Sequence, residues 1–477
     1  MTAANNPPPT PPTSHLEVTN PAVVAQIIER AASPGFERWW AQLARSGFCA
    51  SPVHLAGHGA QGAAKVMGRC KNRRAAVCPS CSQLYAGDTW QLVHAGIAGG
   101  HHGLPDTVAG HPMVFATLTA PSFGPVHARP KPGTSGSPQT CHPVGANQHC
   151  PHGQPAGCRA NHDIRDEAVG QPICADCYDY IGHVLFTWHA PQLWHRFTIR
   201  LRRLVAARLT QVGENPKTLR VSYVKVVELQ RRAVPHFHTV VRLDATGDPQ
   251  EPPAPPQTSL GADELAALLI RAAAAVRLRV IGPAGNVVVC FGSQTDAQPL
   301  DQPVGRTDQA TPEGLSGRRV AAYLAKYVTK SVADFGIATR RISDEAIPEL
   351  PVTDHIRRIL ETITYLAELP DHHRMVEWLH TLGYRGHITS KTRRYSTTMG
   401  ALLAQRAAWR QHEQGRGPGA TDSEAGPGQD AEPSDWHFTG YGHTNNGERV
   451  LAISAAARIA EQRRMARDVA ADEAEEP

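Results

Sequence analysis

Two histidines that lie one residue apart could bind one metal ion together. His236 and His238 flank Phe237 in VPHFHTVVRLD, a run rich in β-branched residues that predicts a strand. Because residues i and i+2 of a strand point to the same face, the two imidazoles would lie side by side. Glu228, in the preceding strand-like run, could be a third ligand, and three ligands with open positions are typical of a catalytic metal site. Packed histidines without a metal are the alternative.

Two tyrosines and two lysines alternate in the later helix-like run YLAKYVTK. Tyr323 and Tyr327 lie one helical turn apart, as do Lys326 and Lys330. A tyrosine has a pKa of about 10, so its phenol needs a nearby metal or lysine to act as a nucleophile. A metal, a phenolate and a cation together could transfer a phosphodiester. The alternative is aromatic packing on an amphipathic helix.

Most of the ten cysteines follow CxxC-like spacings, which favours metal sites over a disulfide framework. In the first cluster, Cys78 and Cys81 form a CxxC knuckle that can place two thiolates on one zinc ion. Cys70 and Cys49 could complete four sulfur ligands, although Cys49 could also be a buried thiol.

The second CxxC knuckle is formed by Cys174 and Cys177. More cysteines and histidines precede it than one zinc site needs. We expect its ligands to be Cys150, Cys158, Cys174 and Cys177. His152 and His162 are possible substitutes, and Cys141 and His142 are surplus in this interpretation.

Strands and helices must position these groups. The sequence predicts strands at 113–119, 219–229, 235–243 and 286–294, with a hairpin across RRAV. It predicts helices at 183–210, 262–276, 317–332, 354–367, 371–382 and 446–473. This mixture indicates an α+β fold in which helices cover one side of a sheet.

The length of 477 residues allows two to four modules. The predicted parts are a disordered tail (1–20), N-terminal helices with the first zinc knuckle (21–110), a central domain (111–335) with a zinc-binding insertion (141–180), a helical basic region (336–411), and a linker with a charged terminal helix (412–477).

The net charge of +5 is only mildly basic and does not by itself require nucleic acid. Basic residues are clustered, however, at Arg73 and Arg74 and again at Lys391, Arg393 and Arg394. Such clusters could neutralise DNA phosphates, although a solvated surface is the alternative. We see no secretory signal and no apolar run of about 18 residues, so we expect a cytoplasmic protein with no membrane partner.

The runs FATLTAP, PHFHTVVRLD and YLAKYVTK, in that order, resemble the three motifs of HUH endonucleases that initiate rolling-circle replication. The flanking runs RCKNRRAAVCPSCSQLYAGD, CADCYDYIGH and RRYSTTMGAL resemble the replication initiator family of actinobacterial plasmids and integrative conjugative elements. The likeness covers about residues 45–410.

The resemblance implies a nickase and strand transferase that forms a 5′-phosphotyrosine. It also implies a ferredoxin- or RRM-like antiparallel sheet with the two histidines on its middle strand. His236 and His238 match the pair that binds Mg²⁺ or Mn²⁺, Tyr327 the nucleophile, and Tyr323 the second tyrosine. Glu228 is a weaker match, because the third ligand varies within the family. DNA, a host helicase and a host DNA polymerase would be the partners.

Three other functions remain open from the sequence. A conjugative relaxase usually has three histidines and a tyrosine near its N-terminus, whereas here the tyrosines follow the histidines. A single-strand transposase is usually much shorter. A zinc-dependent DNA-binding regulator would keep the cysteine knuckles but would not need the paired YxxK pattern.

Overall fold

The structure is a computed structural model that describes residues 20–59, 62–129, 140–143, 148–163, 166–248, 251–300, 316–330, 332–337, 341–415 and 435–475. Residues 1–19 of the predicted tail and most of the predicted linker lie outside these residues. The chain divides into two compact units, one formed by residues 1–89 with 399–477 and the other by residues 90–398.

A five-stranded antiparallel sheet forms the centre of the larger unit, with strand order β8-β3-β5-β4-β9. Its strands are β3 (Met113–Leu118), β4 (Leu219–Leu229), β5 (Pro235–Ala245), β8 (Asp296–Pro299) and β9 (Thr389–Lys391). The predicted hairpin is confirmed, because β4 and β5 pair along their whole length around a turn at 230–234. β5 is the middle strand, as expected.

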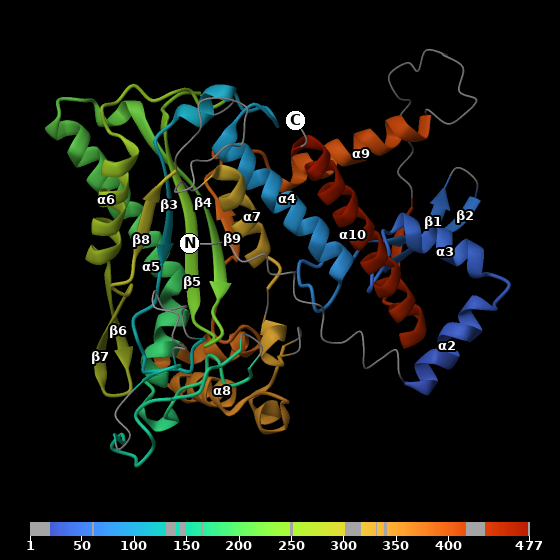
Figure 1. The fold of residues 1–477 in the computed structure, drawn as a ribbon, viewed down its shortest axis with the longest axis horizontal. Helices are drawn as coiled ribbons and strands as arrows, with labels where there is room; N and C mark the ends of the chain where they lie inside the picture. Colours follow the sequence, from blue (N-terminus) through green and yellow to red (C-terminus); the bar gives the residue numbers. More distant parts are fainter. Residues whose placement is uncertain are drawn as a thin grey trace. The chain divides into compact units, whose positions relative to one another are not determined.

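One face of this sheet packs on the main hydrophobic core. Phe237 of β5 points to this face, where its ring stacks on Trp194 of α5 (Tyr180–Gln211) at 5.7 Å between centroids. α6 (Ala262–Ala275) packs against α5 and β3 on the same side (Figure 1). Alternation along the strand then sends the neighbouring His236 and His238 to the opposite face.

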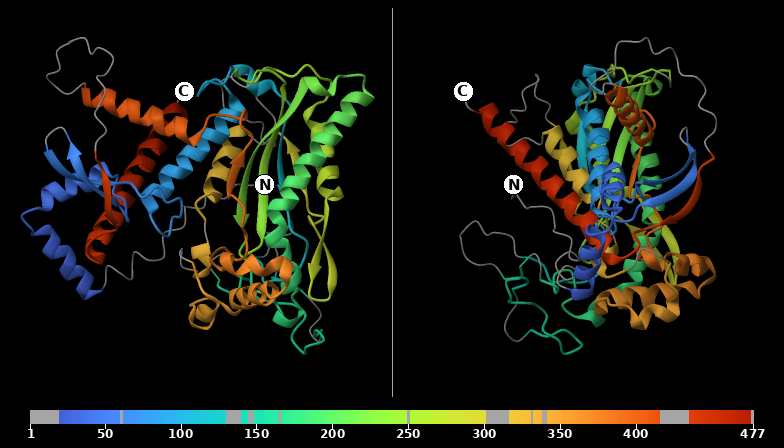
Figure 2. Two further views of the ribbon diagram at one scale, coloured as in Figure 1. Left: turned by 180° about the vertical axis from the view of Figure 1, so that it is seen from behind. Right: turned by 90° about the vertical axis from the view of Figure 1, so that its right-hand side faces the viewer.

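A second helix layer covers that opposite face, which corrects the expectation of helices on one side only. α7 (Gly317–Tyr327) brings the rings of Tyr323 and Tyr327 to 5.1 Å and 5.4 Å from the ring of His238. The views in Figures 1 and 2 agree that α5 and α7 lie on different sides of the sheet. The physical reason is that β5 is buried on both faces, so both faces need cover.

The region predicted at 336–411 contributes to the same core as the sheet. Ile356, Ile359 and Ile363 of α8 (Asp354–Ala367) are buried in the cluster that includes Phe237. The predicted helix at 371–382 is a 3₁₀ segment, η6 (Pro370–Thr381), that packs on α8. The remaining elements are β6 (Arg277–Gly282), β7 (Gly285–Cys290), η1 (Asp106–Gly110), η2 (Ala175–Cys177), η3 (Pro216–Thr218), η4 (Val332–Phe335) and η5 (Asp344–Glu349).

The smaller unit joins the two ends of the chain. Its sheet has the order β10-β1-β2, with β1 (Val53–Gly59), β2 (Gly62–Gly68) and β10 (His437–Tyr441). Its helices are α2 (Pro21–Ala31), α3 (Phe36–Arg45), α9 (Met399–Gly415) and α10 (Asn446–Glu475), and α4 (Pro79–Ala98) begins in it. Within the described residues, no helix combines the length and the apolar character needed to cross a membrane.

Candidate active site and metal centres

The structure brings the predicted carboxylate and histidine pair together. Ligand atoms of Glu228, His236 and His238 all lie within 4.8 Å of one another. The hairpin register explains this, because Glu228 is paired with His236 and therefore shares its face of the sheet. The carboxylate Oε2 of Glu228 lies 3.3 Å from Nε2 of His238.

His238 is held in one orientation by a contact with the neighbouring strand β3. Its Nδ1 lies 3.1 Å from Oγ1 of Thr117, its cross-strand neighbour in the β3–β5 register. Without a bound cation, Nε2–H donates to Glu228. With a cation on Nε2, Nδ1–H would donate to the Thr117 hydroxyl instead, which holds the ring in the same orientation. The side chain is almost fully buried, so this orientation is fixed by packing as well.

His236 has the properties of a metal ligand. Burial lowers its pKa to about 4, and the charge of a protonated His238 acts in the same direction. The imidazole is therefore neutral at physiological pH. Its Nε2 is buried and has no hydrogen-bond partner among the described residues. A neutral imidazole with an unpartnered nitrogen beside a second imidazole and a carboxylate fits a divalent cation.

The two tyrosines lie over this group. The Tyr327 ring is nearly parallel to that of His238, with an interplanar angle of 23°, and the Tyr323 ring stands at 88° to it. Burial raises the pKa of both phenols, and the charge of Glu228 adds to the effect. Both phenols are therefore protonated without an added cation. Tyr323 is 40% exposed, so this side of the group is open to solvent.

Lys330 connects the carboxylate to the nucleophile candidate. Its Nζ lies 2.6 Å from Oε1 of Glu228 and 4.6 Å from the ring centroid of Tyr327. Burial raises the pKa of Glu228, but the hydrogen bond with His238 and the charge of Lys330 outweigh it and lower that pKa overall. Lys326 is exposed, and its Nζ lies 5.9 Å from the Tyr327 ring.

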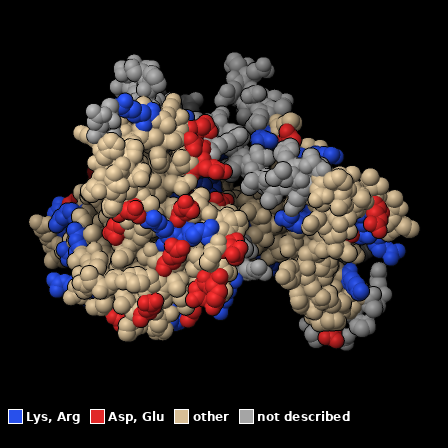
Figure 3. Space-filling model, turned by 90° about the horizontal axis from the view of Figure 1, so that it is seen from below, with Lys and Arg blue, Asp and Glu red and all other residues tan. Residues whose placement is uncertain are grey.

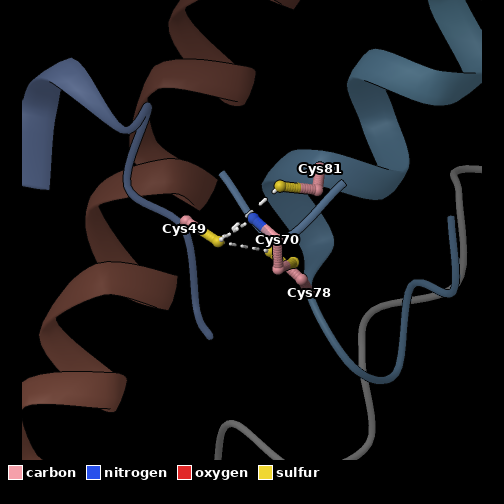
Figure 4. Close-up of side chains that lie close together, drawn as sticks. All are labelled: Cys49, Cys70, Cys78 and Cys81. Atoms are coloured by element: carbon pink, nitrogen blue, oxygen red, sulfur yellow. Dashed lines mark hydrogen bonds between the residues drawn. The ribbon is translucent and has the colours of Figure 1, made fainter. Parts of the chain in front are cut away.

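The first predicted set of zinc ligands converges on one point in the smaller unit. Figure 4 shows the side chains of Cys49, Cys70, Cys78 and Cys81 turned toward one another. The Cys49 sulfur lies 3.6 Å from that of Cys78 and 3.7 Å from that of Cys81. All four are free thiols, and these separations match the edge of about 3.8 Å that a tetrahedral zinc–sulfur site requires.

The insertion, which begins before the predicted residue 141 and covers 124–179, contains two groups of ligands where the sequence interpretation expected one. The first group is Cys150, His152, Cys174 and Cys177, and the second is His127, Cys141, Cys158 and His162. Cys158 is therefore separated from the three cysteines with which we expected it. An antiparallel bridge between His142 and Cys158 brings Cys158 back toward Cys141, which we had treated as surplus. His127 was missed, because it lies outside any CxxC-like spacing.

The basic residues expected to contact DNA differ in their surroundings. Arg393 is exposed. Arg394 donates to the backbone carbonyls of Gly247, Asp248 and Glu251, and Lys391 donates to the carbonyl of Ser396 at 2.9 Å. Burial lowers the pKa of Lys391 to about 8. Among these three side chains, Arg393 is thus the one most open to a phosphate.

Arg73 and Arg74 are half-buried beside the four-cysteine group, and burial lowers the pKa of Arg73. The charges on the face drawn in Figure 3 do not indicate a DNA-binding surface. On the face drawn in Figure 3, acidic and basic side chains of the described residues are intermixed, as on an ordinary solvated surface.

Comparisons with known proteins point to one family. The family model described as "Replication initiator protein, pSAM2", RepSA, matches residues 35–457. A curated replication initiator protein from Streptomyces ambofaciens is 38% identical over 475 residues, which cover 95% of this chain and 97% of that protein. No solved structure matches this chain.

Proposed function

Because this chain belongs to the RepSA family of replication initiator proteins, we propose that it nicks and rejoins one strand at a replication origin. The proposed process is rolling-circle replication through a 5′-phosphotyrosine, as in HUH endonucleases. The observation that carries the proposal is the placement of Tyr327 directly over His238 in the group that also contains His236 and Glu228.

Glu228, His236 and His238 would hold the catalytic cation. A bound Mg²⁺ or Mn²⁺ would supply Lewis-acid polarisation of the scissile phosphate. The carboxylate suits either ion, and two imidazoles make the site softer than the all-oxygen sites that Mg²⁺ prefers. We therefore expect Mn²⁺ to support nicking at lower concentration than Mg²⁺.

Tyr327 is the proposed nucleophile. Its phenolic oxygen attacks the phosphorus and loses its proton to solvent, a new tyrosine–phosphate ester forms, and the bond to the 3′-oxygen breaks. The released 3′-oxygen takes up a proton and becomes the primer end for the host polymerase. Lys330, 4.6 Å from the ring centroid of Tyr327, places a positive charge beside the negative charge that develops during attack.

Tyr323 is the proposed second nucleophile, which would cleave the regenerated origin after one round. Its ring contacts that of Tyr327 at 4.7 Å, so both phenols can serve the same cation site in turn. Energy for rejoining is stored in the tyrosine–DNA ester, so the step needs no nucleotide. Lys326, three residues after Tyr323, would supply the matching positive charge for this second nucleophile.

Recognition of the origin would use groups outside this centre. We propose that Cys49, Cys70, Cys78 and Cys81 hold a structural Zn²⁺ and that the neighbouring Arg73 and Arg74 contact phosphates. In the larger unit, Arg393 is the leading candidate for a phosphate contact. Lys391 and Arg394 would hold the backbone around it through their hydrogen bonds to carbonyl groups. A host helicase would open the duplex ahead of the polymerase.

The test is incubation with supercoiled plasmid that carries the cognate origin, with Mn²⁺ or Mg²⁺. We expect nicked circles with protein attached to the 5′ end, and no adduct with Tyr327→Phe. Tyr365→Phe is the matched control, because Tyr365 is exposed on α8. Full adduct formation by Tyr327→Phe would refute the assignment, and binding without any nicking would favour the regulator instead.

A further inference from the structure

We propose that the insertion between β3 and α5 holds two separate zinc ions, and that one of them braces the turn that carries the histidine pair. The two sites are the Cys₂His₂ group (His127, Cys141, Cys158 and His162) and the Cys₃His group (Cys150, His152, Cys174 and Cys177). The two zinc sites do not depend on the proposed function. The effect of the Cys₂His₂ zinc on the histidine pair, called the brace below, rests on that function.

The Cys₂His₂ group has the geometry of a closed tetrahedral site. Nε2 of His162 lies 3.1 Å from Nδ1 of His127 and 3.3 Å from Sγ of Cys158. Sγ of Cys141 lies 3.9 Å from Nδ1 of His127. Zinc bonds of about 2.0–2.3 Å place ligand atoms about 3.3–3.8 Å apart, close to these values.

A carboxylate outside the group fixes one of its ligands. Oδ2 of Asp166 lies 2.6 Å from Nδ1 of His162, so Nδ1–H donates to the carboxylate and Nε2 is free to bind metal. His162 is itself buried, with 8% exposure. A carboxylate–histidine pair of this kind is the usual support of a zinc ligand and has no role in the nicking chemistry.

The Cys₃His group is built from different segments. Nδ1 of His152 lies 3.3 Å from Sγ of Cys177 and 3.9 Å from Sγ of Cys174. Thiolate and imidazole donors in a four-ligand set select zinc over Mg²⁺ or Mn²⁺.

The insertion needs such cross-links because it has almost no hydrophobic core. Among its described residues from 124 to 179, the buried hydrophobic side chains are those of Cys174 and Tyr178. Its regular structure in the same residues consists of the short η2 and isolated bridges. Small segments without a core are commonly held by metal ions, and two zinc ions would hold this one.

The Cys₂His₂ group is connected to the hairpin turn through Arg231. Nη2 of Arg231 donates to the carbonyl of Asp166 at 3.1 Å, and Nε donates to that of Val169 at 3.3 Å. Gly170 approaches the turn so closely that a Cβ would lie 2.6 Å from the Arg231 backbone. The same turn contains Gln230, whose Nε2 lies 3.3 Å from Nδ1 of His236. Zinc at this group would therefore fix the turn that orients His236.

The zinc count tests the two sites without any activity measurement. Native mass spectrometry of the purified full chain should find three zinc ions, including the one at the four-cysteine group. Cys141→Ser and Cys174→Ser should each lose one, and the double variant two. A wild-type count of two, or an unchanged count in Cys141→Ser, would overturn the proposal, and the wild-type count needs no variant to fold.

The brace is tested by Mn²⁺ binding, followed by electron paramagnetic resonance, in Arg231→Ala. This variant should keep three zinc ions but bind Mn²⁺ about tenfold more weakly, since support outside the ligands tunes metal affinity. Arg358→Ala is the control, because Arg358 bonds Asp176 elsewhere on the insertion at 2.7 Å. Wild-type affinity in Arg231→Ala would refute the brace alone, whereas no Mn²⁺ binding by the wild type would count against the nicking function.

Discussion

The two ring nitrogens of His238 have different neighbours, and this division assigns them different roles. Nδ1 faces the hydroxyl of Thr117 and Nε2 faces the carboxylate of Glu228. The strand alternation that places His238 beside His236 could be predicted from PHFH alone. The contact with Thr117 could not, because it depends on the register between β3 and β5, which lie more than a hundred residues apart.

Thr117→Val should slow origin nicking about tenfold or more, since loss of an orienting partner typically costs a metal ligand that much. The valine keeps the shape and removes the hydroxyl, so the fold should persist. Nicking rates at saturating Mn²⁺ and the Mn²⁺ concentration for half-maximal rate provide the measurement. Thr119→Val is the control, because the Thr119 hydroxyl donates instead to the Gln294 carbonyl. Equal rates for the two variants would contradict the orienting role.

At the scale of elements, the β4–β5 hairpin has two different faces. Glu228, His236 and His238 lie on one, and Lys225 lies with Phe237 on the other, beneath Trp194. The sequence predicted the hairpin, because both strands are rich in β-branched residues. It did not predict that α7 covers the second face, because a strand buried on both sides loses the alternation that distinguishes core from solvent.

Lys225→Met should raise the stability of the larger unit at neutral pH. Burial lowers the pKa of Lys225 to about 8, below the 10.5 of an unfolded lysine, although its Nζ donates to the His387 carbonyl. Below pH 8 the folded state carries a charge that it disfavours. Between pH 8 and 10.5 the unfolded state binds more protons, so stability rises with pH. The substitution should add about 1–3 kcal/mol at pH 7 and remove this rise.

Chemical denaturation at pH 7 and at pH 10 checks this prediction. If Lys225→Met is less stable than wild type at pH 7, the buried cation contributes more through its carbonyl and aromatic contacts than its desolvation costs. An unchanged pH dependence would show that another group is responsible.

Gly170→Ala should loosen the insertion from the hairpin turn. Gly170 has a φ of +95°, which an alanine rarely adopts, and its Cβ would meet the Arg231 backbone. Gly153→Ala is a matched control, because Gly153 has a φ of +73° but nothing within 4 Å of a Cβ. Both variants should incur backbone strain of about 1 kcal/mol or more, and only Gly170→Ala the contact penalty. Limited proteolysis within the insertion should therefore accelerate more in Gly170→Ala, and equal rates would argue against the close contact.

At the scale of the whole molecule, the C-terminal helix packs against a helix near the start of the chain. α10 packs on α2, where Glu448 forms an ion pair with Arg30 at 3.1 Å and Gln26 accepts from the Gly447 amide. Ile453 of α10 also packs in the buried cluster that contains Cys49 and Cys78. The sequence predicted a terminal helix but not its partner, because helical periodicity identifies a buried face without identifying what covers it. The ligand groups of the insertion were partly predictable: Cys150, Cys174 and Cys177 were expected together and do meet, whereas the antiparallel bridge between His142 and Cys158 takes Cys158 to the other group.

Cys81→Ser should therefore separate origin recognition from DNA cleavage. It removes one of four sulfurs from the smaller unit, while the larger unit has its own core and contains all of the proposed catalytic residues. We expect loss of one zinc ion and duplex-origin binding at least about tenfold weaker, as phosphate contacts beside the site are lost. Cleavage of a single-stranded origin oligonucleotide should be retained. Cys290→Ser, at a free cysteine of β7 outside the ligand groups, is the control. If oligonucleotide cleavage fell in parallel with duplex binding, origin recognition by the smaller unit would not be separable from cleavage by the larger unit.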